Sequence, residues 1–338
     1  MTAEALRPVP PEFAQALREL GLAAGEALRG VPLAGGVSSE IWCIESLHGP
    51  VCAKRALPKL RVVADWFAPI ERNQYEARWM QVANAACPGS APRVLAQHAG
   101  LGVLVMSYLP ATNHRLWKEE LRQGHADIPT SQTVGRTLAR IHAYSAAHPE
   151  LVSQFDTDRI FFDIRLEPYL VAAAAKHADL APALQTLVTQ TQTHKHALVH
   201  GDVSPKNILI GPGGPVLVDA ECAWWGDPAF DLAFCLNHML LKCAWTPAAT
   251  AGFLGCFGAL AEAYLEEVDW ESRARLEQRA AALLPGLLLA RVDGKSPVEY
   301  LTTHAQCHAV RHTARALLMR PVSRLADVCA AWREALGR

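Results

Sequence analysis

Two short polar segments separated by a compact turn constrain the middle of this chain more than any other feature. The first segment spans residues 200–207 (HGDVSPKN), and the second is the acidic triplet 219–221 (DAE). Apolar stretches at 208–210 and 216–218 flank the Gly- and Pro-rich turn 211–215. Such a turn excludes a continuous helix and is typical of a β-hairpin. The pattern therefore predicts a hairpin whose open end carries both polar segments.

The side chains at that open end have the chemistry of a divalent-cation site. Asp202 and Asn207 precede the first expected strand, and Asp219 follows the second. Carboxylate and amide oxygens are ligands that Mg²⁺ accepts, with water and phosphate oxygens completing the shell. Phosphoryl transfer needs mainly positioning and charge neutralisation, so a few such groups suffice. Taken singly, each piece has a plain structural explanation, because HGD is an ordinary turn and an Asp after a strand often caps a helix.

Longer segments around these residues resemble a known superfamily. Residues 200–209 and 218–233 (VDAECAWWGDPAFDLA) resemble the catalytic and metal-binding segments of the aminoglycoside phosphotransferase and choline kinase superfamily. The DxE form of the second segment also resembles methylthioribose kinases. The resemblance implies an α+β, protein-kinase-like fold with two lobes, a small antiparallel β-sheet lobe at 1–106 and a larger, mainly helical lobe at 107–338.

The same resemblance implies roles for individual residues. Asp202 is expected to be the catalytic aspartate, and Asn207 and Asp219 are expected to hold Mg²⁺ against ATP. Glu221 is expected to be a further metal ligand, direct or through water. Asp231 matches a buried family aspartate that braces the catalytic loop, and it is interpreted as structural.

One position departs from the protein-kinase pattern. The kinase catalytic loop has a lysine two residues after its aspartate, whereas this chain has Ser204 there and Lys206 two residues further on. The sequence leaves open which cation faces the transferring phosphoryl group.

A glycine-containing loop upstream predicts phosphate contacts. The segment 33–39 (LAGGVSS) precedes an expected strand, and glycines allow a backbone to approach phosphates closely. The loop is similar to the GGxSN segment of choline kinases and aminoglycoside phosphotransferases, with Ser39 in place of Asn. We expect Gly35, Gly36, Ser38 and Ser39 to lie over the phosphates, although a Gly-Gly turn between strands is also common without this role.

An ion pair is expected next to this loop. Lys54 lies on the second expected strand (50–56), from which its ammonium can reach the α- and β-phosphates, and Arg55 is a competing candidate. Glu76 lies in a helical pattern 22 residues later, and the family uses a Lys–Glu pair to aim the lysine. Glu71 is the alternative partner.

The strand-like run 101–106 predicts the connection between the lobes. In the superfamily such a segment binds adenine through its backbone, so the hinge is assigned to 106–110, with Met106 and Tyr108 as contacts. ATP is expected in the cleft between the lobes.

Residues that bind the acceptor are harder to predict. Trp224 and Trp225, together with Trp245, are candidates because tryptophans can cage a quaternary ammonium through cation–π attraction. Their alternative role is in the core or the cleft wall. Arg291 and Lys295 lie in a polar insert and suit a hydroxylated or anionic acceptor better than a polycationic aminoglycoside, unless the insert is an ordinary surface loop.

Composition excludes several other classes. The chain has 338 residues, is 51% hydrophobic and has a formal net charge of −1. It contains no block of basic residues of the kind that predicts nucleic-acid binding. Its nine cysteines form no CxxC pair and the first residues contain no signal-peptide core, which favours a cytoplasmic location. The uncharged stretch 243–261 is interpreted as a buried helix rather than a membrane span. Further helices are expected at 131–148, capped by Thr130, and within 262–284.

These observations predict an ATP- and Mg²⁺-dependent kinase that phosphorylates a hydroxyl of a small molecule, such as an amino alcohol, a sugar or a related metabolite. Two alternatives stay open, a nucleotide-binding regulatory module without turnover and an aminoglycoside-modifying phosphotransferase. The motifs serve nucleotide and metal, so they do not identify the acceptor, and the sequence does not predict the oligomeric state.

Overall fold

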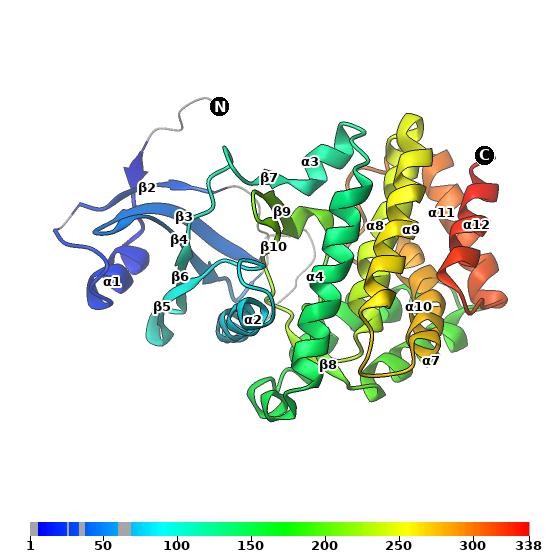
Figure 1. Ribbon diagram of the computed structural model, residues 1–338, viewed down its shortest axis with the longest axis horizontal. Coiled ribbons are helices and arrows are strands. Elements are labelled where there is room, and N and C mark those ends of the chain that lie inside the picture. The colour runs from blue at the N-terminus through cyan, green and yellow to red at the C-terminus, as the bar shows by residue number, and fades with distance from the viewer. Residues whose placement is uncertain (1–5, 26, 34–37, 60–68, 338) are drawn as a thin grey trace.

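The structure is a computed structural model that describes residues 6–25, 27–33, 38–59 and 69–337. Figure 1 shows a β-sheet with two helices at the N-terminal end of the molecule and a larger group of helices at the C-terminal end. The predicted α+β class, with a small antiparallel sheet and a mainly helical second lobe, is confirmed. The predicted division at residues 106 and 107 falls at the end of the last strand of this sheet.

The sheet contains six antiparallel strands in the order β1-β2-β3-β4-β6-β5. They are β1 (Arg7–Pro8), β2 (Arg29–Pro32), β3 (Ser39–Ser46), β4 (Gly49–Ala56), β5 (Val94–His98) and β6 (Val103–Ser107). The two helices of this lobe are α1 (Pro11–Glu19) and α2 (Arg72–Ala86).

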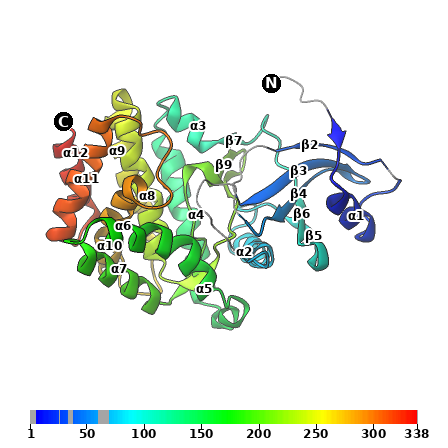
Figure 2. The ribbon, with the colours of Figure 1, turned by 180° about the vertical axis from the view of Figure 1, so that it is seen from behind.

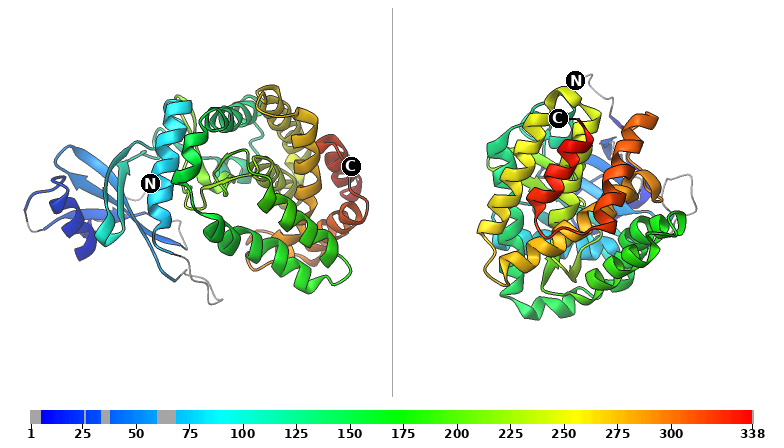
Figure 3. Two further views of the ribbon diagram at one scale, coloured as in Figure 1. Left: turned by 90° about the horizontal axis from the view of Figure 1, so that it is seen from below. Right: turned by 90° about the vertical axis from the view of Figure 1, so that its right-hand side faces the viewer.

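The alternation of side chains along β4 and β6 separates the two faces of the sheet. Ala53 and Val105 are register partners and pack into a small core with Phe13 of α1. One residue further along β4, Lys54 pairs with Leu104, which packs into the large core with α2. Because successive side chains on a strand point to opposite faces, Lys54 points to the α2 side of the sheet. Figure 3 shows α2 in cyan between the sheet and the helical lobe.

The second lobe is built mainly of helices. They are α3 (Trp117–Arg122), α4 (Ile128–Ala146), α5 (Asp158–Phe161), a π-helix (Phe162–Val171), α6 (Ala172–Lys176), α7 (Ala181–Thr193), α8 (Ala229–Trp245), α9 (Thr250–Glu266), α10 (Arg273–Asp293), α11 (His304–Met319) and α12 (Leu325–Ala335). Short 3₁₀ turns cover Ala99–Leu101, Pro149–Gln154, Pro205–Asn207 and Pro247–Ala249. Helix α8 packs against α9 and α10, and α4 packs against α9 (Figure 2).

Two small sheets position the polar segments within this lobe. Strands β9 (Ile208–Gly211) and β10 (Gly214–Leu217) form the predicted hairpin, and β7 (Arg115–Leu116), which follows the hinge, pairs with β9. Strand β8 (Ala197–Val199) pairs with β11 (Trp224–Gly226). The hairpin prediction is therefore confirmed, with a turn shorter than the one predicted from the apolar runs.

The limits predicted for one helix are wrong. Helix α4 begins at Ile128, and its cap is Asp127, whose carboxylate accepts a hydrogen bond from Thr130 N at 3.2 Å. The predicted Thr130 cap instead lies in the first turn, because Pro129 also fits the first turn of a helix. The region 262–284 is helix-rich as expected, since it contains the end of α9 and the first part of α10.

The uncharged stretch 243–261 includes the expected helix. It is interrupted after Trp245, and its second part continues as α9, which packs against α4 and α8. Among the described residues, the segment Pro247–Glu266 is long and apolar enough to cross a membrane, and half of its apolar window is buried in the structure.

Candidate active site

A buried lysine joins the sheet, helix α2 and the hairpin. Lys54 Nζ lies 2.7 Å from Oε2 of Glu76 and also forms an ion pair with Asp219. Lys54 and Glu76 are 2% and 1% exposed, so this pair is screened little by water. The predicted alternatives take other places, since Arg55 pairs with Glu12 and Glu71 is exposed at the start of α2. The structure thus brings together the Lys–Glu pair that the sequence predicted.

Burial and charge shift the pKa values within this cluster in opposite directions. Burial raises the pKa of Glu76 to about 7, with Lys54 opposing the shift. Burial also raises the pKa of Asp219, but the nearby ammonium groups of Lys54 and Lys206 together outweigh it, so that pKa lies well below its usual range. Asp219 is therefore the more firmly ionised of the two carboxylates.

The hairpin brings Asn207 and Asp219 close together. Val218 N donates a hydrogen bond to Asn207 O at 3.0 Å, directly beyond the last register pair, Ile208 with Leu217. Asn207 Nδ2 donates to Asp202 O at 3.1 Å, which turns its amide oxygen away from that carbonyl. Asp219 has a φ of 67°, in the left-handed region that non-glycine residues seldom occupy. The two oxygen-bearing side chains predicted as metal ligands line the same cavity.

Two cationic side chains form ion pairs with the same carboxylate oxygen of Asp202. Its Oδ2 lies 2.8 Å from Arg165 Nη2 and 3.2 Å from Lys206 Nζ, whereas Ser204 Oγ is 3.5 Å from Oδ1. Burial alone raises the pKa of Asp202, but Arg165 and then Lys206 outweigh it, so the pKa lies below its ordinary value. Asp202 is therefore an ionised carboxylate with Oδ1 less engaged than Oδ2.

Asp231 fixes the backbone of the loop that carries Asp202. Its Oδ2 accepts a hydrogen bond from His200 N at 2.7 Å, and Oδ1 accepts one from Gly201 N at 2.8 Å. His142 Nε2 lies 3.2 Å from Oδ2, and the other ring nitrogen lies 2.7 Å from the hydroxyl of Tyr264. These contacts fit the structural role predicted for Asp231.

Glu221 has a different environment from Asn207 and Asp219. It forms an ion pair with Nε of Arg72 at 2.9 Å and does not line the cavity that Asn207 and Asp219 line. Arg72 also donates to Ser38 O and Leu57 O, which ties β3 and β4 to α2. The structure therefore does not place Glu221 with the predicted metal ligands.

A cavity of about 640 Å³ lies between the lobes next to these groups. Its polar lining includes Lys54, Glu76, Lys206, Asn207 and Asp219. Its other lining residues include Leu33, Ile41, Cys52, Met106, Tyr108, Leu209 and Val218. Pockets of 300–1,000 Å³ with apolar walls and few polar groups are typical of small-molecule sites. The predicted hinge contacts Met106 and Tyr108 thus border the same space as the charged groups.

The phosphate loop is only partly described. Gly35 and Gly36 lie outside the described residues. Ser38 and Ser39 are 5% and 3% exposed, and neither lines the interlobe cavity. Ser39 Oγ is buried and has no hydrogen-bond partner among the described residues.

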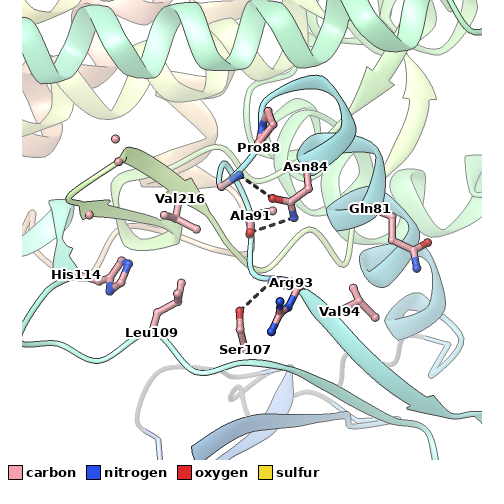
Figure 4. A pocket seen from close by; sticks show the side chains of 14 residues that line it. Gln81, Asn84, Pro88, Ala91, Arg93, Val94, Ser107, Leu109, His114 and Val216 are labelled. Carbon is pink, nitrogen blue, oxygen red and sulfur yellow. Dashed lines mark hydrogen bonds between the residues drawn. The ribbon is translucent and has the colours of Figure 1, made fainter.

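A second cavity, of about 730 Å³, lies behind the hinge and has a different lining (Figure 4). Asn84 and Arg93 line it together with Ser107, Leu109 and His114, and no acidic side chain does so among the described residues. Without a carboxylate, it lacks the groups that hold a divalent cation. We therefore place the chemistry in the interlobe cavity.

The predicted acceptor residues have separate locations. Trp224 is 1% exposed, stacks on Phe161 with ring centroids 4.2 Å apart and donates from Nε1 to Asp158, so it belongs to the core of the helical lobe. Trp225 is also buried, on β11. Lys295 is half-exposed and pairs with Glu167. Neither tryptophan nor Lys295 lines the interlobe cavity, which corrects the proposed tryptophan cage at 224 and 225.

Arg291 alone among these candidates lines a polar cavity beside the catalytic loop. This small cavity is also lined by Ser204 and Lys206. Sequence reasoning missed two arginines nearby, Arg165 and Arg72, which lie outside every recognisable motif. Pro168 inside the π-helix that carries Arg165 is the one available signal, because π-helical turns often occur at functional sites.

Known proteins resemble this chain in sequence and in fold. A sequence model of the phosphotransferase enzyme family matches residues 29–276. Methylthioribose kinase of Yersinia pseudotuberculosis is 28% identical over 224 residues, which cover 58% of this chain and 54% of that protein. The chain thus spans about half the length of the curated relatives it matches.

Two solved structures show the same fold at low sequence identity. A choline/ethanolamine kinase family protein from Mesorhizobium loti has a TM-score of 0.51 at 16% identity, covering 96% of this chain and 99% of its own. Amicoumacin kinase, in complex with AMP-PNP, Ca²⁺ and Ami, has a TM-score of 0.55 at 13% identity, covering 94% and 96%. The family match extends from β2 to α10 and includes both polar segments and the Lys54–Glu76 pair. The chain belongs to the phosphotransferase enzyme family.

Proposed function

We propose that the protein is an ATP- and Mg²⁺-dependent kinase that transfers the γ-phosphoryl group of ATP to a hydroxyl of a small molecule. The observation that carries the proposal is the position of Lys206. Its ammonium lies 3.2 Å from Asp202 Oδ2 and lines the cavity that Lys54, Asn207 and Asp219 also line. In this proposal the Asp202 carboxylate, the Lys206 ammonium and the two metal-type ligands surround the point of transfer.

The cavity accommodates ATP with its ends in defined places. The adenine ring of ATP lies against the hinge at Met106 and Tyr108, and the phosphates of ATP extend toward Lys54 and Asp219. Glu76 aims the Lys54 ammonium at the α- and β-phosphates. The phosphate contact expected of Gly35 and Gly36 stays a prediction, and Ser38 and Ser39 are not assigned to it because neither lines the cavity. The AMP-PNP and Ca²⁺ in the amicoumacin kinase complex support a nucleotide and a divalent cation in this fold.

Asn207 and Asp219 fit a magnesium ion by their donor set, because an amide oxygen and an ionised carboxylate face one cavity. When bound there, Mg²⁺ neutralises charge on the phosphate oxygens. Glu221 acts through Arg72 instead and holds the ends of β3 and β4 in place. Glu221 could bind Mg²⁺ directly only if its ion pair with Arg72 were broken.

Asp202 orients the acceptor. Its Oδ1 accepts a hydrogen bond from the acceptor hydroxyl, while Arg165 and Lys206 hold Oδ2. The acceptor oxygen bonds to the γ-phosphorus, the bond from phosphorus to the bridging oxygen breaks, and ADP leaves. Asp202 takes the hydroxyl proton late, because its lowered pKa makes it a weak base. Lys206 faces the transferring group, at the place left open by Ser204.

A coupled ADP-release assay with a panel of alcohols, sugars and hydroxy acids tests the proposal. Asp202→Asn should lower turnover by about 10²- to 10⁴-fold, the usual contribution of general acid–base catalysis, while calorimetry shows retained ATP binding. Wild-type-like turnover in this variant would remove Asp202 from its role. ATP binding with no turnover across the panel would favour the alternative of a nucleotide-binding regulatory module.

Within the enzyme class, a choline-type, a methylthioribose-type and an aminoglycoside-modifying activity remain separate candidates. The same panel distinguishes them, because they differ in the charge of the acceptor.

A further inference from the structure

A small cavity continues from the interlobe cavity into the helical lobe. It measures about 30 Å³, enough for only a few non-hydrogen atoms. It is lined by Lys118, Ser204, Pro205, Lys206, His238, Lys242, Arg291, Glu299 and Tyr300. Lys118 and Lys206 line both cavities. Asp202 lines neither cavity among the described residues, but Lys206 forms an ion pair with its carboxylate.

The charges around the small cavity are strongly unbalanced. Four cationic side chains line it, and the carboxylate of Glu299 is the one acidic group among the described lining residues. Glu299 is already bonded to Lys118. His238 adds no negative charge, and burial, followed by Arg291 and Lys242, lowers its pKa well below the ordinary value. The cavity therefore has an excess of positive charge.

Lys242 is the most unusual of these cations. It is 1% exposed, and its ammonium lies 3.9 Å from the ring centre of Trp245 and 4.0 Å from that of Tyr300. No carboxylate lies within ion-pair distance of it in the described part of the chain. Burial, reinforced by Lys118, lowers the pKa of Lys242 to about 7. A buried ammonium without an anion is costly unless a partner arrives.

Arg291 provides a second, independent sign of a missing partner. The side chain is 8% exposed, and Nη1 donates to Tyr169 at 3.0 Å and to Ser296. Its Nε is buried and has no hydrogen-bond partner among the described residues. Buried donors in native proteins are nearly always satisfied, so an unpaired guanidinium nitrogen beside a charged cavity points to a ligand.

From this geometry we propose that the small cavity is an anion subsite that receives a carboxylate end of the phosphoryl acceptor. The inference rests on the proposed kinase function and makes the acceptor a small hydroxy acid. A carboxylate fits the volume of the cavity better than a phosphate, which has more oxygen atoms. Its oxygens accept hydrogen bonds from the Lys242 ammonium and the Arg291 guanidinium, while Lys118 remains paired with Glu299.

The subsite also sets the geometry of transfer. Lys206 lies between the two cavities, 3.2 Å from Asp202 Oδ2, so the acceptor hydroxyl reaches Oδ1 when its carboxylate lies beyond Lys206. The carboxylate itself is unchanged by the reaction. The hydroxyl gains the phosphoryl group from ATP, its proton passes to Asp202, and ADP leaves.

A quaternary ammonium acceptor does not fit the same place. The aromatic pair that could cage a cation, Trp245 and Tyr300, has ring centroids 4.5 Å apart and already flanks Lys242. A second cation beside Lys242, Lys118 and Arg291 meets like charge, which is unfavourable in a buried site.

Matched acceptors test the charge requirement. Glycolate, glycerate and gluconate are each compared with the corresponding amide, which keeps the hydroxyls and loses the charge. We expect kcat/KM to be about 10- to 100-fold higher for at least one acid than for its amide, the range of a charged hydrogen bond. Faster turnover of the amides, or of choline, overturns the inference while leaving the kinase function in place.

Three variants connect the effect to the subsite. Lys242→Met removes the charge with little change in volume and should raise KM for the acid, whereas Lys242→Arg should restore part of the affinity. Lys176→Met is the matched control, because Lys176 is exposed at the end of α6 and lines neither cavity. An equal change in KM for the acid in all three variants contradicts the assignment of Lys242 to the subsite.

A binding experiment separates failure of this inference from failure of the kinase function. Acetate, glycerate and inorganic phosphate are titrated at constant ionic strength, with tryptophan fluorescence as the readout because Lys242 contacts Trp245. Saturable carboxylate binding that Lys242→Met loses and Lys176→Met keeps supports the subsite even if no acceptor turns over. Absence of carboxylate binding, or a preference for phosphate, overturns it.

Discussion

Arg165 Nη2 lies 2.8 Å from Oδ2 of Asp202, and the two residues come from segments of the chain that share no motif. Arg165 is 7% exposed and also donates from Nε to Gly201 O and from Nη1 to Ile164 O. This arginine therefore fixes both the carboxylate and the turn before it. In the proposed mechanism it is a positioning residue, because it would act on the acceptor only through Asp202.

Replacing this arginine should damage turnover more than nucleotide binding. Arg165→Met should lower kcat by about 10²-fold, because small displacements of a reacting group have effects of that size. Arg165→Lys keeps a cation and should recover part of the loss. Steady-state kinetics and ATP calorimetry check this, with circular dichroism to confirm folding. Equal turnover in the wild type and Arg165→Met would show that Asp202 needs no such support.

The backbone of Asp219 allows its carboxylate to be tested separately from its conformation. Its φ of 67° suits asparagine far better than alanine, since the left-handed region costs most other residues about 1–2 kcal/mol. Asp219→Asn should weaken Mg²⁺-dependent ATP binding by about 10- to 100-fold with little backbone strain. Calorimetry with Mg²⁺ and with a chelator measures the loss. Unchanged Mg²⁺ dependence in Asp219→Asn contradicts the ligand role.

Asp219→Ala provides the comparison for strain. It should lose the same Mg²⁺ dependence and be less stable than Asp219→Asn in urea unfolding, because alanine occupies the left-handed region poorly.

Gly201 is required by both conformation and space. Its φ is 79°, and a Cβ at this position would lie 2.8 Å from Cys222 Cβ and from Cys222 O. Gly201→Ala should therefore lower the free energy of unfolding by more than the 1–2 kcal/mol of backbone strain alone. Gly213→Ala is the control, because a Cβ there has nothing within 4 Å. Similar urea midpoints for the two variants would disprove this account of the turn.

Lys242 should make stability depend on pH in the acceptor-free protein. Burial lowers its pKa to about 7, so between that pH and its ordinary value the unfolded chain binds more protons and stability rises with pH. Below pH 7 Lys242 is protonated in both the folded and the unfolded chain, and its buried charge destabilises the folded state. The charged or titratable groups around it are Lys118, Glu119, Lys206, His238, Arg291, Glu299 and Tyr300.

Lys242→Met lacks this proton linkage. Its melting temperature should exceed that of the wild type most at pH 6, and the difference should shrink as the pH rises toward 10. Differential scanning calorimetry at several pH values measures the difference, with Lys176→Met as the control. A difference that is constant with pH would show that Lys242 keeps an ordinary pKa.

Local sequence was sufficient for the hairpin and its ends. The turn between β9 and β10 contains residues that only a tight turn accommodates, and the flanking apolar runs set the register. Asn207 and Asp219 meet because they flank paired strands, so their proximity follows from short-range pairing. The Lys54–Glu76 pair followed from strand alternation and from the resemblance to a known superfamily.

Other predictions were wrong where tertiary contacts, rather than the local sequence pattern, decide the position of a side chain or the start of a helix. Trp224 has the chemistry of a cation cage, but stacking on Phe161 and burial in the core decided its place. The cap of α4 is Asp127 rather than Thr130, since the Asp127 carboxylate accepts a hydrogen bond from Thr130 N. Both outcomes depend on neighbours that a linear pattern does not specify.

The sequence by itself determined the β9–β10 hairpin and the strand position of Lys54, because these depend on turn chemistry and on alternation along one strand. The two-lobe class followed from the resemblance to a known superfamily. Only the tertiary structure decided that Arg165 supports Asp202 and that Lys242 and Arg291 meet beside Lys206. Those contacts join segments far apart in the chain, and their energies come from burial and from charges that face one another only after the helices have packed.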